Sequence, residues 1–509
     1  MFVRKKRNKS GSISVQVINK DNGYKVVATI GASHDANEIE RLVIRGRQFI
    51  KSLQPPQPYL FPNVSHEDQV INAFVDSLSS SQIHTIGPEL IFGTLFDRIG
   101  FNAIPDEMFR HITMARLAYP VSKLKTVDYL SRYRGIQKSV DEIYLFLDRL
   151  AGRHKGQAET VAYEYTKRRL GKVSIVFYDM TTLYFEAEDE DDFRKIGFSK
   201  DGKFQHPQIM LGLLVGERGL PIGYDIYEGN TFEGKTLLPF LENIQRKHGF
   251  EKPVVVADAG LLSKRNLQNL SSEQYKFIIG ARLKNEDAGI QQKVLGKRSG
   301  MKDGDTFVIQ KAGGVRLVVG YSTSRAKKDA ANREKGLRKL RTQLKTDRLT
   351  KEHINKRGYN KFLTITGNAT VALDEEKVKE DERWDGLKGY LTNTLMPSAA
   401  IIENYKHLWQ IERAFRISKT DLRVRPVFHR LRRRIEAHIC VAFVAYTIYK
   451  ELELLLAAIN SGMSSKRAAE LTHTMYSLTY RVPDSGEEKQ VTLKMSDEQQ
   501  IVYRAVFGG

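Results

Sequence analysis

The sequence predicts an α/β protein of several domains, built around a mixed β-sheet with helices. Its 509 residues exceed what one ordinary core accommodates, so two to four domains are expected. Strand-like runs between 173 and 284 are mixed with helix-like segments, and the run PVVVADAG lacks the polar alternation of a half-solvated strand. Such a run is typical of a strand that is buried on both faces, in the middle of a mixed or parallel sheet.

The composition indicates a globular protein that binds a polyanion. Hydrophobic residues make up 41% of the chain, and 81 Lys and Arg against 60 Asp and Glu give a net charge of +21. An excess of that size predicts attraction to nucleic acid or to an anionic membrane surface. The basic N-terminus has no apolar stretch behind it, and no segment approaches the length of a membrane span, so we expect no membrane partner and a cytoplasmic, nucleoid-associated location. The single cysteine, Cys440, excludes an internal disulfide and a Cys-based zinc site.

The N-terminal third is expected to hold two small units. Residues 1–55 carry alternating segments and then a helix-like stretch, which predicts a β-hairpin and helix unit, followed by a Pro-rich linker. Residues 65–170 have a helical pattern, in which Ser139 and Glu142 form a capping-box signature. Two short helices around Gly135, rich in Lys and Arg, suit either a DNA-binding helix-turn-helix or an ordinary helical hairpin with solvated charges.

Residues 171–284 carry three strand-like runs, a helix-like segment, the run VVVAD and a further helix. This is the strand and helix order of ribonuclease H, so a ribonuclease-H-like mixed sheet is expected, with 171–284 as its first part and 396–460 as its second. Residues 285–395 interrupt that order with two strand-like runs and a basic stretch from Arg325 to Arg357, which suits either a solvated amphipathic helix or a phosphate-facing one. Residues 461–509 are expected to be a C-terminal tail.

Two carboxylates end apolar strand-like runs of the expected sheet. Asp179 ends VSIVFYD, and Asp258 ends VVVAD. If the strands are neighbours, their ends bring both groups together at the sheet edge where ligands bind. Cleavage of a phosphodiester needs carboxylate oxygens from separate elements to hold two divalent cations, and Mg²⁺ prefers carboxylates and water over histidine or thiolate. A single Asp at a strand end is often only a turn or cap residue, so the assignment needs a third group.

The third carboxylate is Glu412, in the helix-like segment ENYKHLWQIERAFRISKTDL. Tyr405, Glu412 and Lys419 are seven residues apart, which predicts one face of a single helix. Arg413, Arg416 and Lys419 flank the acid, and this arrangement suits a metal carboxylate with phosphate-binding groups around it; a surface helix with ion pairs is the alternative.

The segment Y-x₂-L-W-x₂-E-R-x-F-R-x₂-K resembles the tyrosine–arginine–glutamate–lysine signature of cut-and-paste insertion-sequence transposases of the DDE type. Tyr405, Glu412 and Lys419 match at the family spacing, whereas the family arginine falls on Leu408, for which Arg413 or Arg416 is the substitute available. The segments YDMTT, FSKDGKFQHPQ, EGNTFEGKTL, VVVADAG and RWDG are similar to the same family, and the resemblance covers about 170 to 445.

The resemblance implies a ribonuclease-H-like catalytic core with 285–395 as a mostly β insertion domain. It implies Asp179, Asp258 and Glu412 as catalytic residues and ligands of two Mg²⁺ or Mn²⁺ ions, with Tyr405, Arg413, Arg416 and Lys419 gripping phosphates. It further implies a homodimer in a synaptic complex that acts on double-stranded DNA, both the terminal inverted repeats of a mobile element and its target. Patterns for ATP binding are absent from the sequence.

Trp384 lies in RWDG, near the end of the expected insertion. Related transposases present an aromatic from this region to stack a flipped base, so Trp384 is a candidate DNA contact, and packing of the insertion against the core is the alternative. Two other functions stay open from the sequence: a transposase-derived DNA-binding protein without catalysis, and a ribonuclease-H-like nuclease without strand transfer.

Overall fold

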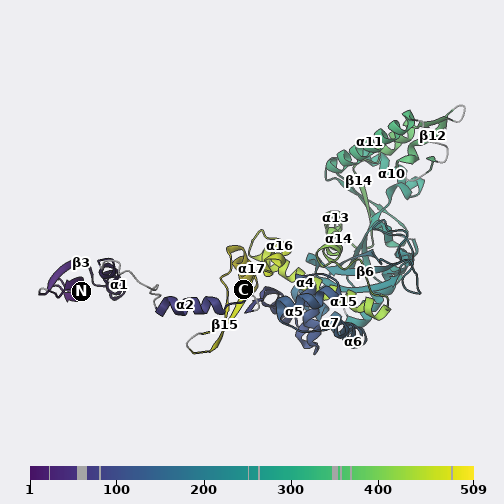
Figure 1. Cartoon of the computed structure of the whole chain (residues 1–509). Helices are drawn as coiled ribbons and strands as arrows, with labels where there is room; N and C mark the ends of the chain where they lie inside the picture. Colours follow the sequence, from purple (N-terminus) through teal and green to yellow (C-terminus); the bar gives the residue numbers. More distant parts are fainter. Residues whose placement is uncertain are drawn as a thin grey trace. The chain divides into compact units, whose positions relative to one another are not determined.

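The computed structural model describes most of the chain, in two compact units (Figure 1). The first unit comprises 1–78 with 481–487, and the second comprises 79–480 with 488–509. The described residues are 1–21, 23–53, 66–79, 82–249, 251–261, 264–346, 353–355, 358–366, 370–482 and 485–508. The expected Pro-rich linker lies almost entirely outside them.

The first unit is a three-stranded antiparallel sheet with helices, not the expected hairpin and helix. Its elements are β1 (Phe2–Arg7), β2 (Ile13–Asn19), β3 (Lys25–Ser33), α1 (Ala36–Ser52) and α2 (His66–Ser77). Val15 of β2 is buried with Ile39 and Leu42 of α1. The sequence FVRKKR of β1 is mostly charged, so it does not show the apolar alternation that predicts a strand. Its backbone pairing with β2 places it in the sheet.

The second unit begins with β4 (Ile83–Thr85) and a helical segment. Its α-helices are α3 (Thr94–Ile99), α4 (Glu107–Ala118), α5 (Lys123–Arg134), α6 (Val140–Arg149) and α7 (Lys155–Leu170). The capping box is confirmed, because Ser139 and Glu142 exchange side-chain to backbone hydrogen bonds at the start of α6. Gly135 ends α5 with φ of 65°, a left-handed conformation that suits glycine.

An eight-stranded mixed sheet forms the centre of the second unit, so the α/β class is confirmed. Its order is β10-β11-β14-β9-β8-β5-β6-β7, in which β5, β8 and β9 are parallel neighbours and the other pairs are antiparallel. The five strands that belong to 171–284 are β5 (Ile175–Tyr184), β6 (Gln208–Gly216), β7 (Pro221–Glu228), β8 (Val254–Ala257) and β9 (Lys276–Ala281).

Helices cover both faces of this sheet. Phe177, Val256 and Ile278 face a large core that includes α15 (Arg432–Ala458), where Cys440 is buried and free. Their chain neighbours, such as Val176 and Val255, face a second core with α8 (Leu237–His248) and α9 (Lys264–Ser272). Because alternate residues of both strands enter different cores, β8 and the first part of β5, up to Tyr178, carry no charged residue.

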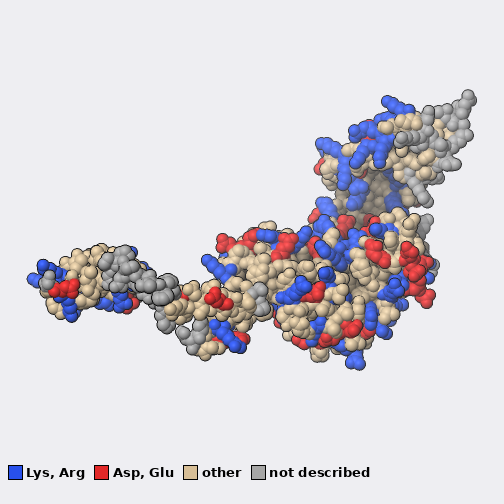
Figure 2. Space-filling model, viewed as in Figure 1, with Lys and Arg blue, Asp and Glu red and all other residues tan. Residues whose placement is uncertain are grey.

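The expectation of a mostly β insertion over 285–395 is wrong, because the described part of that segment contains more helix than strand. Its elements are α10 (Ala288–Arg298), β10 (Thr306–Gln310), β11 (Arg316–Tyr321), α11 (Thr323–Lys345), β12 (Leu363–Thr366), β13 (Thr370–Leu373), α12 (Glu375–Glu382) and β14 (Leu387–Thr392). Three of these strands, β10, β11 and β14, extend the central sheet instead of forming a separate one. Up to Lys345 the basic stretch is the long helix α11, where Leu337 and Leu340 are buried and most Lys and Arg are exposed. Figure 2 shows Lys and Arg gathered over this part of the unit.

The last segment, 461–509, is not a tail. It forms α16 (Ser465–Thr472), β15 (Tyr476–Arg481), β16 (Glu488–Thr492) and α17 (Asp497–Phe507), and β15 pairs with β4. Val502 and Val506 of α17 are buried in the same core as α15. Burial of these apolar residues against the core is what orders the segment. Within the described parts of the chain, no helix combines the length and apolarity that a bilayer span requires.

Candidate active site

Asp179 and Asp258 lie side by side on two neighbouring parallel strands. The register pairs Tyr178 of β5 with Ala257 of β8, and each aspartate is the next residue. Asp179 does not end its strand as expected, because β5 continues to Tyr184 in a ladder with β6; it lies where the pairing with β8 stops. Burial raises the pKa of Asp179, and the negative charges of Glu233 and Asp258 add to this effect, while Lys200 opposes it.

Tyr405 binds Asp258 directly. Its hydroxyl donates to Asp258 Oδ1 over 3.0 Å from helix α13 (Ser398–Lys406). Burial raises the pKa of Tyr405, and the charges of Asp258 and then Glu412 raise it further. Glu412 is exposed on α14 (Trp409–Arg416), close enough to act on Tyr405 electrostatically.

The segment with Tyr405, Glu412 and Lys419 is not one regular helix. It breaks between α13 and α14 at His407 and Leu408, where the hydrogen bonds are of the shorter i to i+3 type, and Lys419 lies on a π-helical turn, Ile417–Asp421. Leu408, at the position of the family arginine, is buried in the core. Its apolar side chain can form no charged contact with a phosphate.

The three cations of this segment have different surroundings. Arg413 forms an ion pair with Glu453 at 2.8 Å. Arg416 is exposed, and its guanidinium has no ion pair within the described residues. Lys419 is largely buried, 10% exposed, and its Nζ lies 3.1 Å from Asp201 Oδ2.

Four residues that were not singled out as site residues also belong to this site. Lys388 of β14 lies over the Tyr405 ring, 4.4 Å from its centroid, and its pKa is lowered by burial and by Arg325, an effect that Asp258 and Glu412 oppose. Gly280 of β9 faces the Tyr405 hydroxyl so closely that an added Cβ would lie 2.4 Å from it. The remaining two are Lys200 and Glu233, whose charged groups lie 2.8 Å apart.

The sequence could have revealed only some of these residues. Lys200 and Glu233 lie in the segments FSKDGKFQHPQ and EGNTFEGKTL, whereas nothing in the sequence distinguishes Lys388 from other strand lysines.

A cavity of about 860 Å³ leads from Asp258 toward helix α11. Asp258, Gly280, Lys388 and Tyr405 line one part of it, and side chains of α11 and the RWDG turn line another. The cavity therefore connects Asp258 to the basic helix α11 of segment 285–395.

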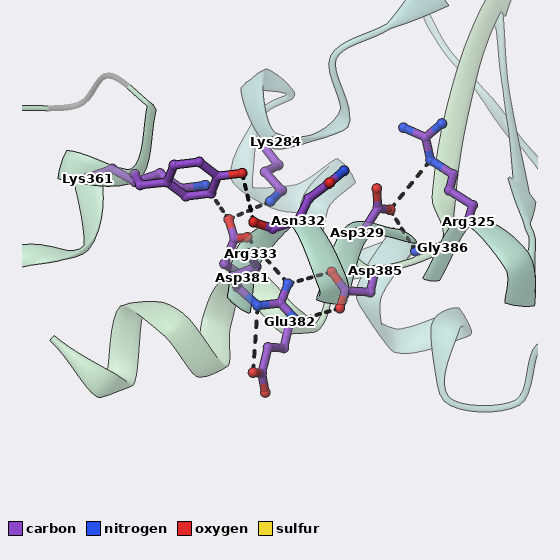
Figure 3. A network of polar contacts seen from close by, with 11 residues as sticks. Lys284, Arg325, Asp329, Asn332, Arg333, Lys361, Asp381, Glu382, Asp385 and Gly386 are labelled. Atoms are coloured by element: carbon purple, nitrogen blue, oxygen red, sulfur yellow. Dashed lines mark hydrogen bonds and ion pairs between the residues drawn. The ribbon is translucent and has the colours of Figure 1, made fainter. Parts of the chain in front are cut away.

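Trp384 is buried, 8% exposed, although it lines this cavity. It belongs to the same buried cluster as Leu283 and Leu387. This environment agrees with the alternative that Trp384 serves packing. Asp385 of RWDG is also structural, because Arg333 of α11 binds both of its carboxylate oxygens at 2.6 Å, as Figure 3 shows. Asp381 of α12 forms ion pairs with Lys284 and Lys361 at 2.6 Å and with Arg333 at 3.7 Å. One network of charges therefore joins α11 and α12 to the segment that follows β9 (Figure 3).

The donor chemistry at Asp179 and Asp258 fits a hard divalent cation. Both groups offer carboxylate oxygens, the ligand type that such cations prefer. Burial is the main cause of the raised pKa of Asp179, and the nearby charges of Glu233 and Asp258 add to it. In the described part of the chain, no three His, Cys, Asp or Glu side chains are grouped closely enough to hold a metal ion as they stand.

Comparison with known proteins gave a family match, and weak structural likenesses that include two transposase complexes. A family model described as "Transposase DDE domain" matches residues 170–448. A piggyBac transposase synaptic complex with hairpin DNA is similar at 10% identity and a TM-score of 0.38, over 76% of this chain and 78% of that chain. A Mos1 transposase paired-end complex with the left transposon end is similar at 11% identity and a TM-score of 0.16, over 47% of this chain and 66% of that chain. A search of curated proteins found no match.

Proposed function

Because the chain belongs to the family of transposase DDE domains, we propose that it binds the terminal inverted repeats of its own insertion sequence, cleaves the DNA ends and joins them to target DNA. The observation that carries this proposal is the position of Asp179 and Asp258 at adjacent places on parallel strands, with Tyr405 on Asp258 and Glu412 beside it. The three carboxylates belong to separate elements, β5, the residue after β8, and α14, and phosphodiester cleavage requires such a set.

Asp179, Asp258 and Glu412 are the proposed ligands of two Mg²⁺ or Mn²⁺ ions. When bound, such ions activate the attacking hydroxyl and stabilise the leaving oxygen. Tyr405 orients Asp258 through its hydrogen bond, and Lys388 holds positive charge close to Asp258 and Glu412. Lys419 and Arg416 are the proposed phosphate contacts of the helical segment, because Arg413 is already paired with Glu453. The buried Trp384 packs with Leu283 and Leu387.

The proposed function also assigns roles to three domains: a catalytic core, an insertion and a DNA-binding domain. Strands β5 to β9, with β5, β8 and β9 parallel, support a ribonuclease-H-like core, and 285–395 is an insertion that extends its sheet. Helices α5 and α6 belong to the proposed DNA-binding domain, and a homodimer holds the two element ends in the synaptic complex.

Cleavage and joining by the purified full chain test this function. The substrate is DNA cloned from both flanks of the coding sequence, with Mg²⁺. Asp179→Asn, Asp258→Asn and Glu412→Gln should each reduce cleavage and joining of pre-cut ends to background while DNA binding persists, because the basic surface is unchanged. Asp192→Asn, an exposed acid in the loop after β5, is the matched control and should keep wild-type activity.

Two results would contradict the proposal. Cleavage by Glu412→Gln at the wild-type rate would remove Glu412 from the ligand set. Cleavage without joining of pre-cut ends would identify a nuclease instead of a transposase.

A further inference from the structure

Two consecutive residues of opposite charge connect the carboxylates of the candidate site to its phosphate-binding cations. Lys200 and Asp201 lie in the connection between β5 and β6. The side chain of Lys200 reaches Asp179, and that of Asp201 reaches Lys419. One short turn therefore contacts both the acidic and the basic side of the site.

The ammonium group of Lys200 lies among the acids. Its Nζ is 2.8 Å from Glu233 Oε1, 3.6 Å from Asp179 Oδ1, and donates to the Met180 carbonyl over 2.5 Å. Two carboxylates, those of Glu233 and Asp179, contact this single cation, and the charge of Asp258 acts on Asp179 as well. The cluster therefore keeps an excess of negative charge, which a divalent cation would neutralise better than one ammonium does.

The carboxylate of Asp201 has the opposite surroundings. Its oxygens lie 3.1 and 3.2 Å from Lys419 Nζ, and Arg425 Nη1 is 2.5 Å from Oδ2. Asp201 is only 15% exposed, and Lys419 10%. Lys419 and Arg425 thus both pair with one internal carboxylate, in a geometry that would also suit an oxyanion. Because two cations share one anion, an excess of positive charge remains.

Hydrogen bonds fix the turn between these two contacts. The backbone N–H of Lys200 donates to Thr182 Oγ1 over 3.1 Å, which ties the turn to β5. The buried Ser199 hydroxyl accepts from the N–H groups of Asp201 and Lys203 at 3.3 and 3.1 Å. Because the two side chains leave adjacent positions of one fixed turn, moving one of them disturbs the position of the other.

We propose that Lys200 and Asp201 are positioning residues of the active site, whose charges occupy the places of the divalent cation at Asp179 and of a DNA phosphate at Lys419 until those ligands displace them. This inference rests on the proposed function and adds a coupling to it. Displacement of Asp201 by a phosphate loosens the turn that holds Lys200, so DNA increases the affinity for the cation, and the cation increases the affinity for DNA by the same factor.

Direct binding measurements on the full-length protein test this inference without activity. Mn²⁺ affinity is measured by electron paramagnetic resonance of free Mn²⁺, and DNA affinity by fluorescence anisotropy of a labelled duplex. Lys200→Met should bind Mn²⁺ about 10-fold more tightly than wild type, because a competing cation is removed. Lys200→Arg should retain the weaker binding.

Asp201→Asn should bind the duplex about 10-fold more tightly without metal, and Asp201→Glu should restore wild-type affinity. Lys203→Met is the matched control from the same turn, an exposed lysine that touches neither Asp179 nor Lys419, and should change neither affinity. In wild type the duplex should increase Mn²⁺ affinity; in the Lys200→Met, Asp201→Asn double variant this increase should disappear.

Unchanged or weaker Mn²⁺ binding by a folded Lys200→Met or Lys200→Gln variant would overturn the inference, since Lys200 would then only support the fold. Melting temperature and near-ultraviolet circular dichroism establish folding for each variant. A different result marks failure of the proposed function: Mn²⁺ affinity unchanged by Asp179→Asn and by Asp258→Asn would mean that these carboxylates bind no cation.

Discussion

Tyr405 is the residue whose environment constrains the candidate site most tightly. Its hydroxyl binds Asp258, its ring lies under Lys388, and its edge faces Gly280. The sequence predicts Tyr405 as a phosphate contact through the family signature, whereas its observed partner is a carboxylate. Spacing along a helix places a residue on a face, but the partner depends on strands β8, β9 and β14, which come from distant parts of the sequence.

Substitution of Gly280 by Ala should displace Tyr405. The added methyl group would lie 2.4 Å from the Tyr405 hydroxyl and 3.1 Å from Cζ, so the ring has to move away from Asp258. Overpacking of this kind costs about 1–3 kcal/mol of unfolding free energy. We expect that loss in chemical denaturation, together with reduced DNA cleavage.

Two further variants isolate the cause. Gly296→Ala in α10 meets no atom within 4 Å and should leave cleavage unchanged. Tyr405→Phe removes the crowded hydroxyl, so the Gly280→Ala, Tyr405→Phe double variant should be more stable than the sum of the single effects predicts. Additive effects would show that Gly280 and Tyr405 do not interact.

At the scale of elements, patterns in the sequence predicted those strands and helix ends that depend on neighbouring residues in the chain. The VVVAD run is the buried parallel strand β8, and the Ser139 and Glu142 capping box begins α6. Asp179 and Asp258 could be expected to be neighbours because each follows such a run. Elements whose order comes from tertiary pairing were not predicted: β1 has a charged sequence, and β10, β11 and β14 join the central sheet across a long segment.

The signature helix illustrates the same limit within the site. A regular repeat of seven residues predicts one straight face for Tyr405, Glu412 and Lys419. The helix instead has an i to i+3 hydrogen bond at Leu408 and a π-helical turn at Lys419. Burial of Leu408 in the core and the pairing of Lys419 with Asp201 accompany these departures, and neither follows from local periodicity.

The RWDG turn between α12 and β14 should act as a packing element. Trp384 is 8% exposed, so Trp384→Ala should lower the unfolding free energy by about 3–5 kcal/mol and reduce all activities together. Trp409→Ala is the matched control for stability, since Trp409 is 49% exposed and should cost far less. Near-wild-type stability of Trp384→Ala, with a selective defect after first-strand nicking, would instead favour base stacking.

At the scale of the whole molecule, the second unit buries a group of cations where α4, the start of α5 and α15 meet. Arg116 donates to the carbonyls of Leu422 and Arg423, and its Nη2 lies 3.4 Å from His438 Nδ1. His438 Nε2 lies 2.9 Å from the Val424 carbonyl, so the neutral imidazole donates there and accepts from Arg116. Burial lowers the pKa of Lys123 and of His438 well below their ordinary values, and Arg116 lowers both further.

This group should make the protein sensitive to acid. Burial, Lys123 and Arg116 lower the pKa of His429 to about 3, and the pKa of His438 is also well below its ordinary value of 6.5. Below pH 6.5 the unfolded chain therefore binds protons that the folded chain does not. Each such histidine should reduce the unfolding free energy by about 1.4 kcal/mol per pH unit as pH falls from 6.5 toward the folded pKa.

Replacement of His438 by Gln separates this effect from packing, because an amide can occupy the same space without titrating. At pH 8, where the imidazole is neutral in both states, His438→Gln should be less stable than wild type by the packing loss alone. As pH falls below 6.5, wild type should lose stability faster, so the difference between the two proteins shrinks and then reverses. A difference that stays constant from pH 8 to pH 5 in urea denaturation would mean that His438 takes up its proton in the folded state despite Arg116 and Lys123.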